Sequence, residues 1–343
     1  MAVRVGIVGL GMMGTTHFKS YGQIPDAQVV AVCDVDAKKL AGDWAGAAGN
    51  IDTGAAQTVD LAAIRRYSSY GKFMKDAGID VVDICLPTFL HEKLAAKAFA
   101  AGKHVICEKP MALKAAKARK MIDAAAAAGK FLGMAHVLRF WPEYVMLKSM
   151  IDSGRYGKVR RAYFSRFASR PTWTWGNWSQ DSKRSGAGAL DLHIHDTDLV
   201  QWYFGKPTAV TSRGTFDPDG GAAHILTAFD VPGGELVVAE GGWDLPAGFP
   251  FEMAARILFE TAAVDFSSSA TPTLTVYDAK TGQSEHPEVL GVSGYTEELR
   301  YFIGCIEAGR ASDRIMPAEA SDAVAIVEAE VRSARSGRTV KIK

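Results

Sequence analysis

A chain of 343 residues exceeds the size of most single hydrophobic cores, so the sequence predicts two domains. Apolar residues make up 48% of the chain, which is enough to form packed interiors. The net charge of +1 argues against nucleic acid and membrane surfaces as partners, because both attract strongly basic proteins.

The sequence shows neither a targeting segment nor a membrane span. Val3–Val8 already forms a strand-like apolar run, with no charged and apolar segments of a signal peptide before it. No run of about 18 apolar residues predicts a membrane helix. The spacing of the four cysteines fits neither a disulfide framework nor a zinc ribbon. We therefore expect a reduced, cytoplasmic protein without a bound metal.

The first 136 residues alternate short apolar runs with helical stretches. The predicted strands are Val3–Val8, Val29–Cys33, Val81–Leu86, His104–Cys107 and Phe131–Ala135. The predicted helices are Met13–Tyr21, Ala37–Ala45, Glu92–Ala100 and Lys114–Ala128. Apolar runs of this length are typical of strands buried on both faces. The alternation predicts an α/β domain over residues 1–136, with a doubly wound parallel sheet of the Rossmann type.

A glycine motif joins the first strand to the first helix. Its residues are Gly9, Leu10, Gly11, Met12, Met13 and Gly14. In this context Gly9 allows a tight turn, Gly11 lets a pyrophosphate approach the backbone, and Gly14 permits close packing of helix on strand. The N-terminus of the helix supplies free N–H groups and a positive dipole end. The motif alone is weak evidence, but its position predicts a dinucleotide site that includes Met12 and Met13.

Asp34 follows the second strand, twenty residues after Gly14, where a ribose-binding carboxylate is expected. Such a carboxylate accepts hydrogen bonds from ribose hydroxyls and repels a 2′-phosphate, and no arginine directly follows it. This favours NAD over NADP, with NADP still possible. The alternative for Asp34 is a helix N-cap, a position that Asp36 can also take.

The pattern changes near residue 137 to that of an α+β domain. A helix is predicted from Trp141-Pro142 to Ser153-Gly154, and three more over Ala187–Phe204, Thr296–Ala308 and Pro317–Ser336. The predicted strands are Val159–Ala168, Thr208–Gly214, Ala222–Asp230, Glu235–Glu240, Ala255–Asp265 and Pro272–Tyr277. We expect residues 137–343 to form a large, open, mostly antiparallel sheet for substrate binding and oligomerisation. The C-terminal helix or strand is a candidate to pack back on the first domain.

Glu108-Lys109-Pro110 closes the strand that begins at His104. Ligands of open α/β sheets bind outside the carboxyl ends of the strands, so Lys109 is predicted at the nicotinamide end of the dinucleotide. The alternative is a solvated surface charge. Oxidation of a secondary alcohol needs a general base whose pKa is near the working pH. The pKa of a free lysine is about 10.4, and burial beside positive groups lowers it.

The segment 186–198 carries a second group of candidates. If it is helical, Asp191 and His195 share a face and His193 points elsewhere; if it is extended, all three share a face. In both cases Asp191 and His195 share a face, and we expect Asp191 to orient His195 and His195 to share a proton with Lys109. Two alternatives remain open. One is a metal site on the His-x-His-Asp sequence, which lacks further Cys/His ligands nearby. The other is a structural role that ties the helix to the sheet.

Substrate contacts are expected from the start of the second domain. Tryptophan faces suit the apolar face of a sugar, and polar side chains suit its hydroxyls. The candidates are Arg139, Trp173, Trp175, Asn177, Trp178 and Arg184. Aromatic packing within a long loop is the alternative for each tryptophan. We interpret four further residues as structural, namely His17, His136, Asp196 and Asp198.

The chain resembles the Gfo/Idh/MocA oxidoreductase family over essentially its whole length. The matching segments are Gly9–Gly14, Leu86-Pro87-Thr88-Phe89-Leu90-His91, Gly102-Lys103-His104-Val105-Ile106-Cys107-Glu108-Lys109-Pro110 and the pair Asp191 and His195. The resemblance implies that the catalytic set is Lys109, Asp191 and His195. It also implies that the cofactor cleft is lined by Pro87, His91 and Glu108, and that the Lys109–Pro110 bond is cis.

One residue departs from the family pattern. Many members carry glycine between the aspartate and the histidine, where this chain has His193, so its imidazole is a candidate substrate contact. The resemblance implies an NAD(P)-dependent dehydrogenase or reductase that acts on a secondary alcohol of a sugar, polyol or sugar derivative. The alternatives are an NAD-dependent glycosidase that uses transient oxidation and a non-catalytic dinucleotide-binding regulator. The exposed face of an open sheet is usually covered by another protein surface, so we expect a homodimer or homotetramer in which the sheets pack together.

Overall fold

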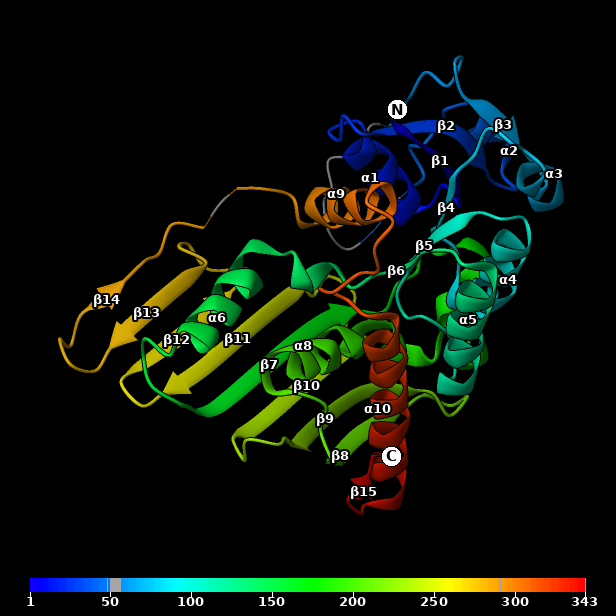
Figure 1. The fold of residues 1–343 in the computed structure, drawn as a ribbon. Coiled ribbons are helices and arrows are strands. Elements are labelled where there is room, and N and C mark those ends of the chain that lie inside the picture. The colour runs from blue at the N-terminus through cyan, green and yellow to red at the C-terminus, as the bar shows by residue number, and fades with distance from the viewer. Residues whose placement is uncertain (48, 50–56, 290, 343) are drawn as a thin grey trace. The chain divides into compact units, whose positions relative to one another are not determined.

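The computed structural model describes residues 1–47, 49, 57–289 and 291–342 (Figure 1). The chain divides into two compact units. Unit 1 comprises Met1–Val137, Trp173–Trp178 and Ser293–Ser321, and unit 2 comprises Leu138–Thr172, Ser179–Val292 and Asp322–Lys343. The first division lies beside the expected boundary, but two later segments group with unit 1. The larger of these contains α9 (Gly294–Glu307), which packs on α1 (Met12–Tyr21).

Unit 1 contains a six-stranded parallel sheet in the order β3-β2-β1-β4-β5-β6, as the alternating pattern predicts. Its strands are β1 (Val3–Val8), β2 (Ala27–Cys33), β3 (Arg65–Tyr67), β4 (Val81–Ile84), β5 (His104–Glu108) and β6 (Leu132–Ala135). The order reverses between β1 and β4. In doubly wound sheets this switch point opens a crevice at the carboxyl ends of the strands, where ligands bind.

The remaining helices of unit 1 are α2 (Ala37–Leu40), α3 (Tyr70–Met74), the short η1 (Thr88–Leu90), α4 (His91–Ala100) and α5 (Ala115–Ala128). The predicted helix Ala37–Ala45 is too long. Gly42 has a left-handed φ of 91°, and a Cβ there would clash with the carbonyl oxygen of Val59, so the backbone cannot continue as a helix. The strand β3 was not predicted because Arg65–Tyr67 is polar and mostly exposed.

Unit 2 contains a nine-stranded sheet in the order β14-β13-β12-β11-β7-β10-β9-β8-β15. Its strands are β7 (Val159–Ser169), β8 (Ala209–Phe216), β9 (Ala222–Asp230), β10 (Leu236–Leu245), β11 (Glu252–Phe259), β12 (Ala262–Ser267), β13 (Leu274–Asp278), β14 (Ser284–Glu285) and β15 (Val340–Lys341). Every neighbouring pair is antiparallel except β7 and β10. The prediction of one strand over Ala255–Asp265 is wrong, since a turn at Glu260 and Thr261 divides this stretch into β11 and β12.

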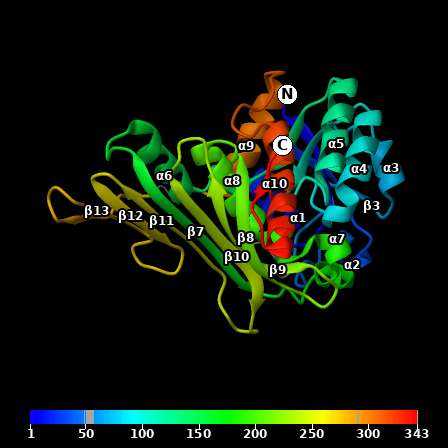
Figure 2. The ribbon, with the colours of Figure 1, turned by 90° about the horizontal axis from the view of Figure 1, so that it is seen from below.

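Helices lie on one side of this sheet (Figures 1 and 2). They are α6 (Pro142–Ser153), α7 (Ser182–Ser185), the π-helical turn η4 (Ala189–His193), α8 (Ile194–Phe204) and most of α10 (Pro317–Ser336). Two other short helices, η2 (Val137–Arg139) and η3 (Trp175–Gln180), span divisions between the units. Tyr144 of α6 packs edge-on against Phe266 of β12, which fixes this helix on the sheet. In the described part of the chain, no helix is both long and apolar enough to cross a membrane.

Candidate active site

The glycine turn lies at the carboxyl end of β1. Gly9 has a left-handed φ of 92°, and a Cβ there would clash with the carbonyl oxygen of Cys85. A Cβ on Gly14 would clash with the carbonyl oxygen of Gly9, so only glycine lets α1 start this close to β1. A Cβ on Gly11 would meet no atom within 4 Å. The backbone at Gly11 is therefore open to a ligand.

The first turn of α1 is suited to an anion. Gly11 is the N-cap residue. Because glycine has no side chain, no capping side chain accepts a hydrogen bond from the first backbone N–H groups of the helix. Met12 and Met13 in this turn are partly exposed. Free amides and the positive end of the helix dipole attract phosphate, so these residues fit the diphosphate of a dinucleotide.

Asp34 ties the end of β2 to the glycine turn. One carboxylate oxygen accepts a hydrogen bond from the backbone N–H of Leu10 at 2.6 Å, and the other accepts from Asp36 at 2.8 Å. Asp36, not Asp34, caps α2, because its side chain accepts from the N–H of Lys38 at 2.9 Å. Asp34 is partly exposed and keeps acceptor positions for ribose hydroxyls.

His91 connects the turn after β4 to the turn after β5. Its Nε2 lies 2.7 Å from the carbonyl oxygen of Leu86, and its Nδ1 lies 2.9 Å from that of Pro110. Burial lowers the pKa of His91, although the two carbonyl contacts oppose this. Pro87 is partly exposed beside this ring. His91 therefore links the two turns that follow β4 and β5, at the edge of the sheet where the cofactor is expected to bind.

Lys109 stands at the carboxyl end of β5. The Lys109–Pro110 peptide bond is cis, and the backbone N–H of Lys109 donates to Glu108 Oε2 at 3.1 Å. Glu108 is buried, with 7% of its surface exposed, whereas Lys109 is partly exposed. The strand order puts β5 next to β4 and one strand away from β1, so Lys109 and the glycine turn share one edge of the sheet.

A buried polar cluster lies behind this edge, and no sequence motif predicts it as a group. It brings His17 of α1 together with Asp83, Cys85 and Glu108. His17 alone was singled out, as a structural histidine. An aspartate inside the apolar strand β4, 0% exposed, is the feature that points to a buried partner.

In unit 2, the candidates occupy the π-helical turn and the first turn of α8. Across residues 187–200 only Asp191 and His195 are partly exposed, and every other residue is buried. His193 is 0% exposed. The segment is helical, and its exposure pattern follows the helical alternative, in which His193 points away from the other two.

Buried ion pairs hold this helix in place. Asp196 bonds to Arg166 of β7 at 2.9 Å, and Asp198 bonds to Arg139 at 2.8 Å. Asp196 and Asp198 are therefore structural residues, as expected. Arg139 is 1% exposed and bound to its carboxylate, so the structure does not offer it as a substrate contact.

His193 also faces the interior instead of a ligand. Its Nε2 lies 3.5 Å from Glu330 Oε2 of α10, and a Cβ on Gly241 of β10 would lie 3.0 Å from its Nδ1. We therefore do not retain His193 as a substrate contact. Trp175 is 58% exposed and Trp178 is partly exposed, and both group with unit 1, so they stay candidates.

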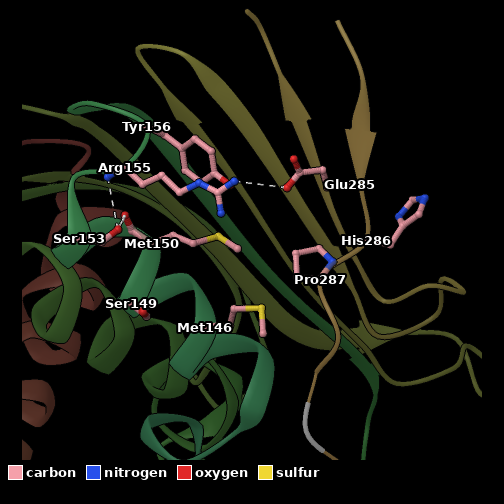
Figure 3. A pocket seen from close by; sticks show the side chains of 9 residues that line it. All are labelled: Met146, Ser149, Met150, Ser153, Arg155, Tyr156, Glu285, His286 and Pro287. Atoms are coloured by element: carbon pink, nitrogen blue, oxygen red, sulfur yellow. Dashed lines mark hydrogen bonds and ion pairs between the residues drawn. The ribbon is translucent and has the colours of Figure 1, made fainter. Parts of the chain in front are cut away.

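An open pocket in unit 2 contains none of the predicted residues (Figure 3). It lies between α6 and the end of β14 and is lined by Met146, Ser149, Met150, Ser153, Arg155, Tyr156, Glu285, His286 and Pro287. An ion pair between Arg155 and Glu285, at 3.6 Å, satisfies the charges in it.

Two family models match this chain. Residues 3–136 match the model described as "Oxidoreductase family, NAD-binding Rossmann fold", and residues 144–265 match the GFO/IDH/MocA C-terminal domain. Among curated proteins, an inositol 2-dehydrogenase of Rhizobium meliloti (strain 1021) is 26% identical over 100% of both chains. A trans-1,2-dihydrobenzene-1,2-diol dehydrogenase of Mus musculus is 27% identical over 97% of both.

Solved structures show the same fold. A levoglucosan dehydrogenase in complex with NADH and levoglucosan superimposes with a TM-score of 0.83 at 21% identity, covering 100% of both chains. An oxidoreductase from Agrobacterium radiobacter in complex with NAD+, L-tartaric acid and magnesium gives a TM-score of 0.82 at 21% identity, covering 99% of this chain and 98% of that one.

Proposed function

This chain belongs to the Gfo/Idh/MocA oxidoreductase family and carries its NAD-binding Rossmann domain, and from that premise we propose that it oxidises a secondary alcohol of a sugar or polyol. The observation that carries this proposal is the position of Lys109 at the same sheet edge as the glycine turn. The names of the full-length relatives, an inositol dehydrogenase and a dihydrodiol dehydrogenase, support a cyclic compound with neighbouring hydroxyls as substrate.

The proposed chemistry divides between cofactor and protein. NAD, when bound, supplies the acceptor for the hydride of the C–H bond. Lys109 accepts the proton of the substrate hydroxyl, His195 shares that proton, and Asp191 orients His195. The partial exposure of all three side chains within otherwise buried segments supports these roles. In the reverse direction the same groups donate the proton.

The charge at Asp34 supports NAD over NADP as the cofactor. Its carboxylate is held by Leu10 and Asp36, and in this class of fold a carboxylate after the second strand binds the ribose hydroxyls and repels a 2′-phosphate. Trp175 and Trp178 are proposed as contacts for the apolar face of the substrate, since both expose aromatic surface. We also propose a cytoplasmic homodimer or homotetramer, supported by the exposed apolar side chains on the sheet of unit 2.

The test is the formation of NADH from NAD by the purified protein with a panel of inositols, aldoses and sugar acids. We expect turnover with at least one polyol. Lys109→Met should lower kcat by about 10²–10⁴-fold, the usual range for loss of a general base. Lys97→Met, at an exposed lysine of α4, is the matched control and should leave kcat unchanged.

Three outcomes would contradict this proposal. Full activity of Lys109→Met would remove the lysine from the mechanism. Bound NAD without net NADH from any alcohol, together with cleavage of glycosides, would indicate the glycosidase alternative. Cofactor binding with no turnover of either substrate class would indicate a regulator.

A further inference from the structure

His17 links three elements of unit 1 from a fully buried position in the middle of α1. Its Nδ1 lies 2.8 Å from Asp83 Oδ2 on β4. Its Nε2 lies 3.2 Å from Glu108 Oε1 at the end of β5. Glu108 Oε2 in turn accepts from the backbone N–H of Lys109 at 3.1 Å. A continuous chain of polar contacts therefore runs from α1 to the lysine.

The arrangement favours a doubly protonated imidazole, because Nδ1 hydrogen-bonds to Asp83 and Nε2 lies at ion-pair distance from Glu108 without hydrogen-bond geometry. A neutral ring has one N–H, and its other nitrogen would turn a lone pair toward a buried carboxylate. Only the imidazolium places a positive charge between Asp83 and Glu108. Burial by itself lowers the pKa of His17, but the hydrogen bond and opposite charge of Asp83 raise it, and the pKa lies well above its usual value.

The other titratable groups around His17 are uncharged. The Sγ of Cys85 lies 3.4 Å from His17 Nδ1 and donates to Asp83 Oδ1 at 3.5 Å. Burial raises the pKa of Cys85, so it stays a thiol and the negative charge comes from Asp83. Burial, with Asp83 and Glu298 of α9 nearby, also raises the pKa of Tyr21 well above its usual value, so its hydroxyl stays neutral.

A metal ion is a poorer occupant of this cluster than a proton. The donor atoms of His17, Asp83 and Cys85 all lie within 4.8 Å of one another. A tetrahedral ion with bonds of about 2.0–2.3 Å would hold its ligand atoms more than about 3 Å apart. The separation of 2.8 Å between His17 and Asp83 is that of a direct hydrogen bond.

We infer that His17 is a positioning residue for Lys109: its imidazolium, anchored on Asp83, holds the Glu108 carboxylate that fixes the Lys109–Pro110 turn. The inference rests on the proposed role of Lys109. Because His17 lies on the helix that starts at the glycine turn, it also joins the diphosphate end of the cofactor site to the proton acceptor. The positive charge of His17 offsets the negative charge of the Glu108 carboxylate beside Lys109.

The first test measures the protonation state of His17 without any turnover. Nitrogen NMR of histidine-labelled protein, assigned with His17→Gln, should show both ring nitrogens still protonated at neutral pH, where an ordinary histidine is mostly neutral. Asp83→Asn should bring the deprotonation of His17 to lower pH. A neutral His17 ring at pH 7 in the native protein, or one equivalent of tightly bound metal, would overturn the inference whether or not a substrate is found.

The second test separates positioning from general stability. His17→Gln should lower kcat by about 10–100-fold with little change in the affinity for NADH. The acidic limb of its kcat–pH profile should move to higher pH by about half a unit or more, because the proton acceptor loses a nearby positive charge. The control is His104→Gln, at the opposite end of β5, which should leave the profile unchanged.

The outcomes distinguish the two proposals. A wild-type pH profile and kcat in folded His17→Gln would overturn the role of His17 while the oxidoreductase assignment stands. If His17→Gln does not fold, the NMR titrations of the native protein and Asp83→Asn decide. No polyol turnover in the native protein, with His17 protonated as expected, would leave the contact chain intact and remove the role proposed for Lys109.

Discussion

The Asp34 carboxylate holds the glycine turn and is also our proposed ribose contact, and this decides how its substitution should behave. It accepts a hydrogen bond from the backbone N–H of Leu10 in the glycine turn. An ordinary ribose contact would affect only the choice between NAD and NADP. Loss of Asp34 also frees the backbone N–H of Leu10, so the shape of the diphosphate site should change too.

Asp34→Ala should therefore raise the KM for NAD by about tenfold or more and shift the ratio of kcat/KM values toward NADP. A hydrogen bond to a charged group contributes about 1.5–3 kcal/mol, which corresponds to this magnitude. Steady-state kinetics with both cofactors measures it. The control is Asp36→Ala, which removes the cap of α2 and should cost about 1 kcal/mol of stability without altering cofactor preference. An unchanged preference in Asp34→Ala would contradict the assignment.

Individual residues differ in how far sequence alone could place them. The glycine turn was predictable because its backbone requirements are local. The role of Arg139 was not predictable. Its partner Asp198 is 59 residues away, and sequence alone does not show whether an arginine binds a substrate or a carboxylate of the protein. His17 was correctly expected to be structural in character, but its contact with Glu108 depends on how α1 crosses two strands.

At the scale of elements, the π-helical turn η4 controls where Asp191 and His195 point. It presses against the sheet, since a Cβ on Gly188 would clash with the carbonyl oxygen of Ala223. From the other side, Glu330 of α10 contacts His193 and accepts from the hydroxyl of Thr197 at 3.2 Å. The turn is therefore fixed between a strand and a helix that are distant in sequence.

The pair of His193 and Glu330 predicts a pH-dependent stability. Burial lowers the pKa of His193, but Glu330 outweighs this and raises it above the usual value. A raised pKa in the folded state contributes stability that is fully present below about pH 6.5 and is lost as pH rises through the folded value. Urea unfolding of the native protein and His193→Gln should thus differ most at pH 6 and less at pH 9.

Comparing the two proteins at each pH cancels the contribution of other histidines, including His17. Glu330→Gln should remove the same pH dependence, and the double variant should add little to either single one. A difference in unfolding free energy that grows with pH would contradict the charged pair. His195 should keep its reactivity in folded His193→Gln if the imidazole only supports the turn.

Elements with a clear period were predictable, and those fixed by distant contacts were not. The parallel strands of unit 1 are buried apolar runs, which sequence shows directly. The hairpin of β11 and β12 was missed because no glycine or proline marks its turn and the alternation of burial resumes after it. The short strand β3 forms only because β2 offers it an edge.

For the molecule as a whole, the strongest expectation is self-association through the sheet of unit 2. Alternate residues of its strands are buried under the helices, and the intervening residues face the other way. That second face carries exposed apolar side chains, with Leu226 at 39%, Leu236 at 57% and Tyr277 at 50%. It also carries an ordered polar network in which Glu240 binds both Tyr163 and His224.

A face that combines exposed apolar groups with fixed polar groups resembles a protein interface more than a solvated surface. Light scattering at micromolar concentration should give the mass of a dimer or tetramer. The double variant Leu226→Lys with Tyr277→Lys should shift the mass toward that of the monomer, since each lysine would have to be desolvated on association. Met316→Lys, at an exposed apolar residue of unit 1, is the matched control and should leave the mass unchanged. A monomeric mass for the native protein would mean that this sheet face is stable in water, and its polar network would then need another explanation.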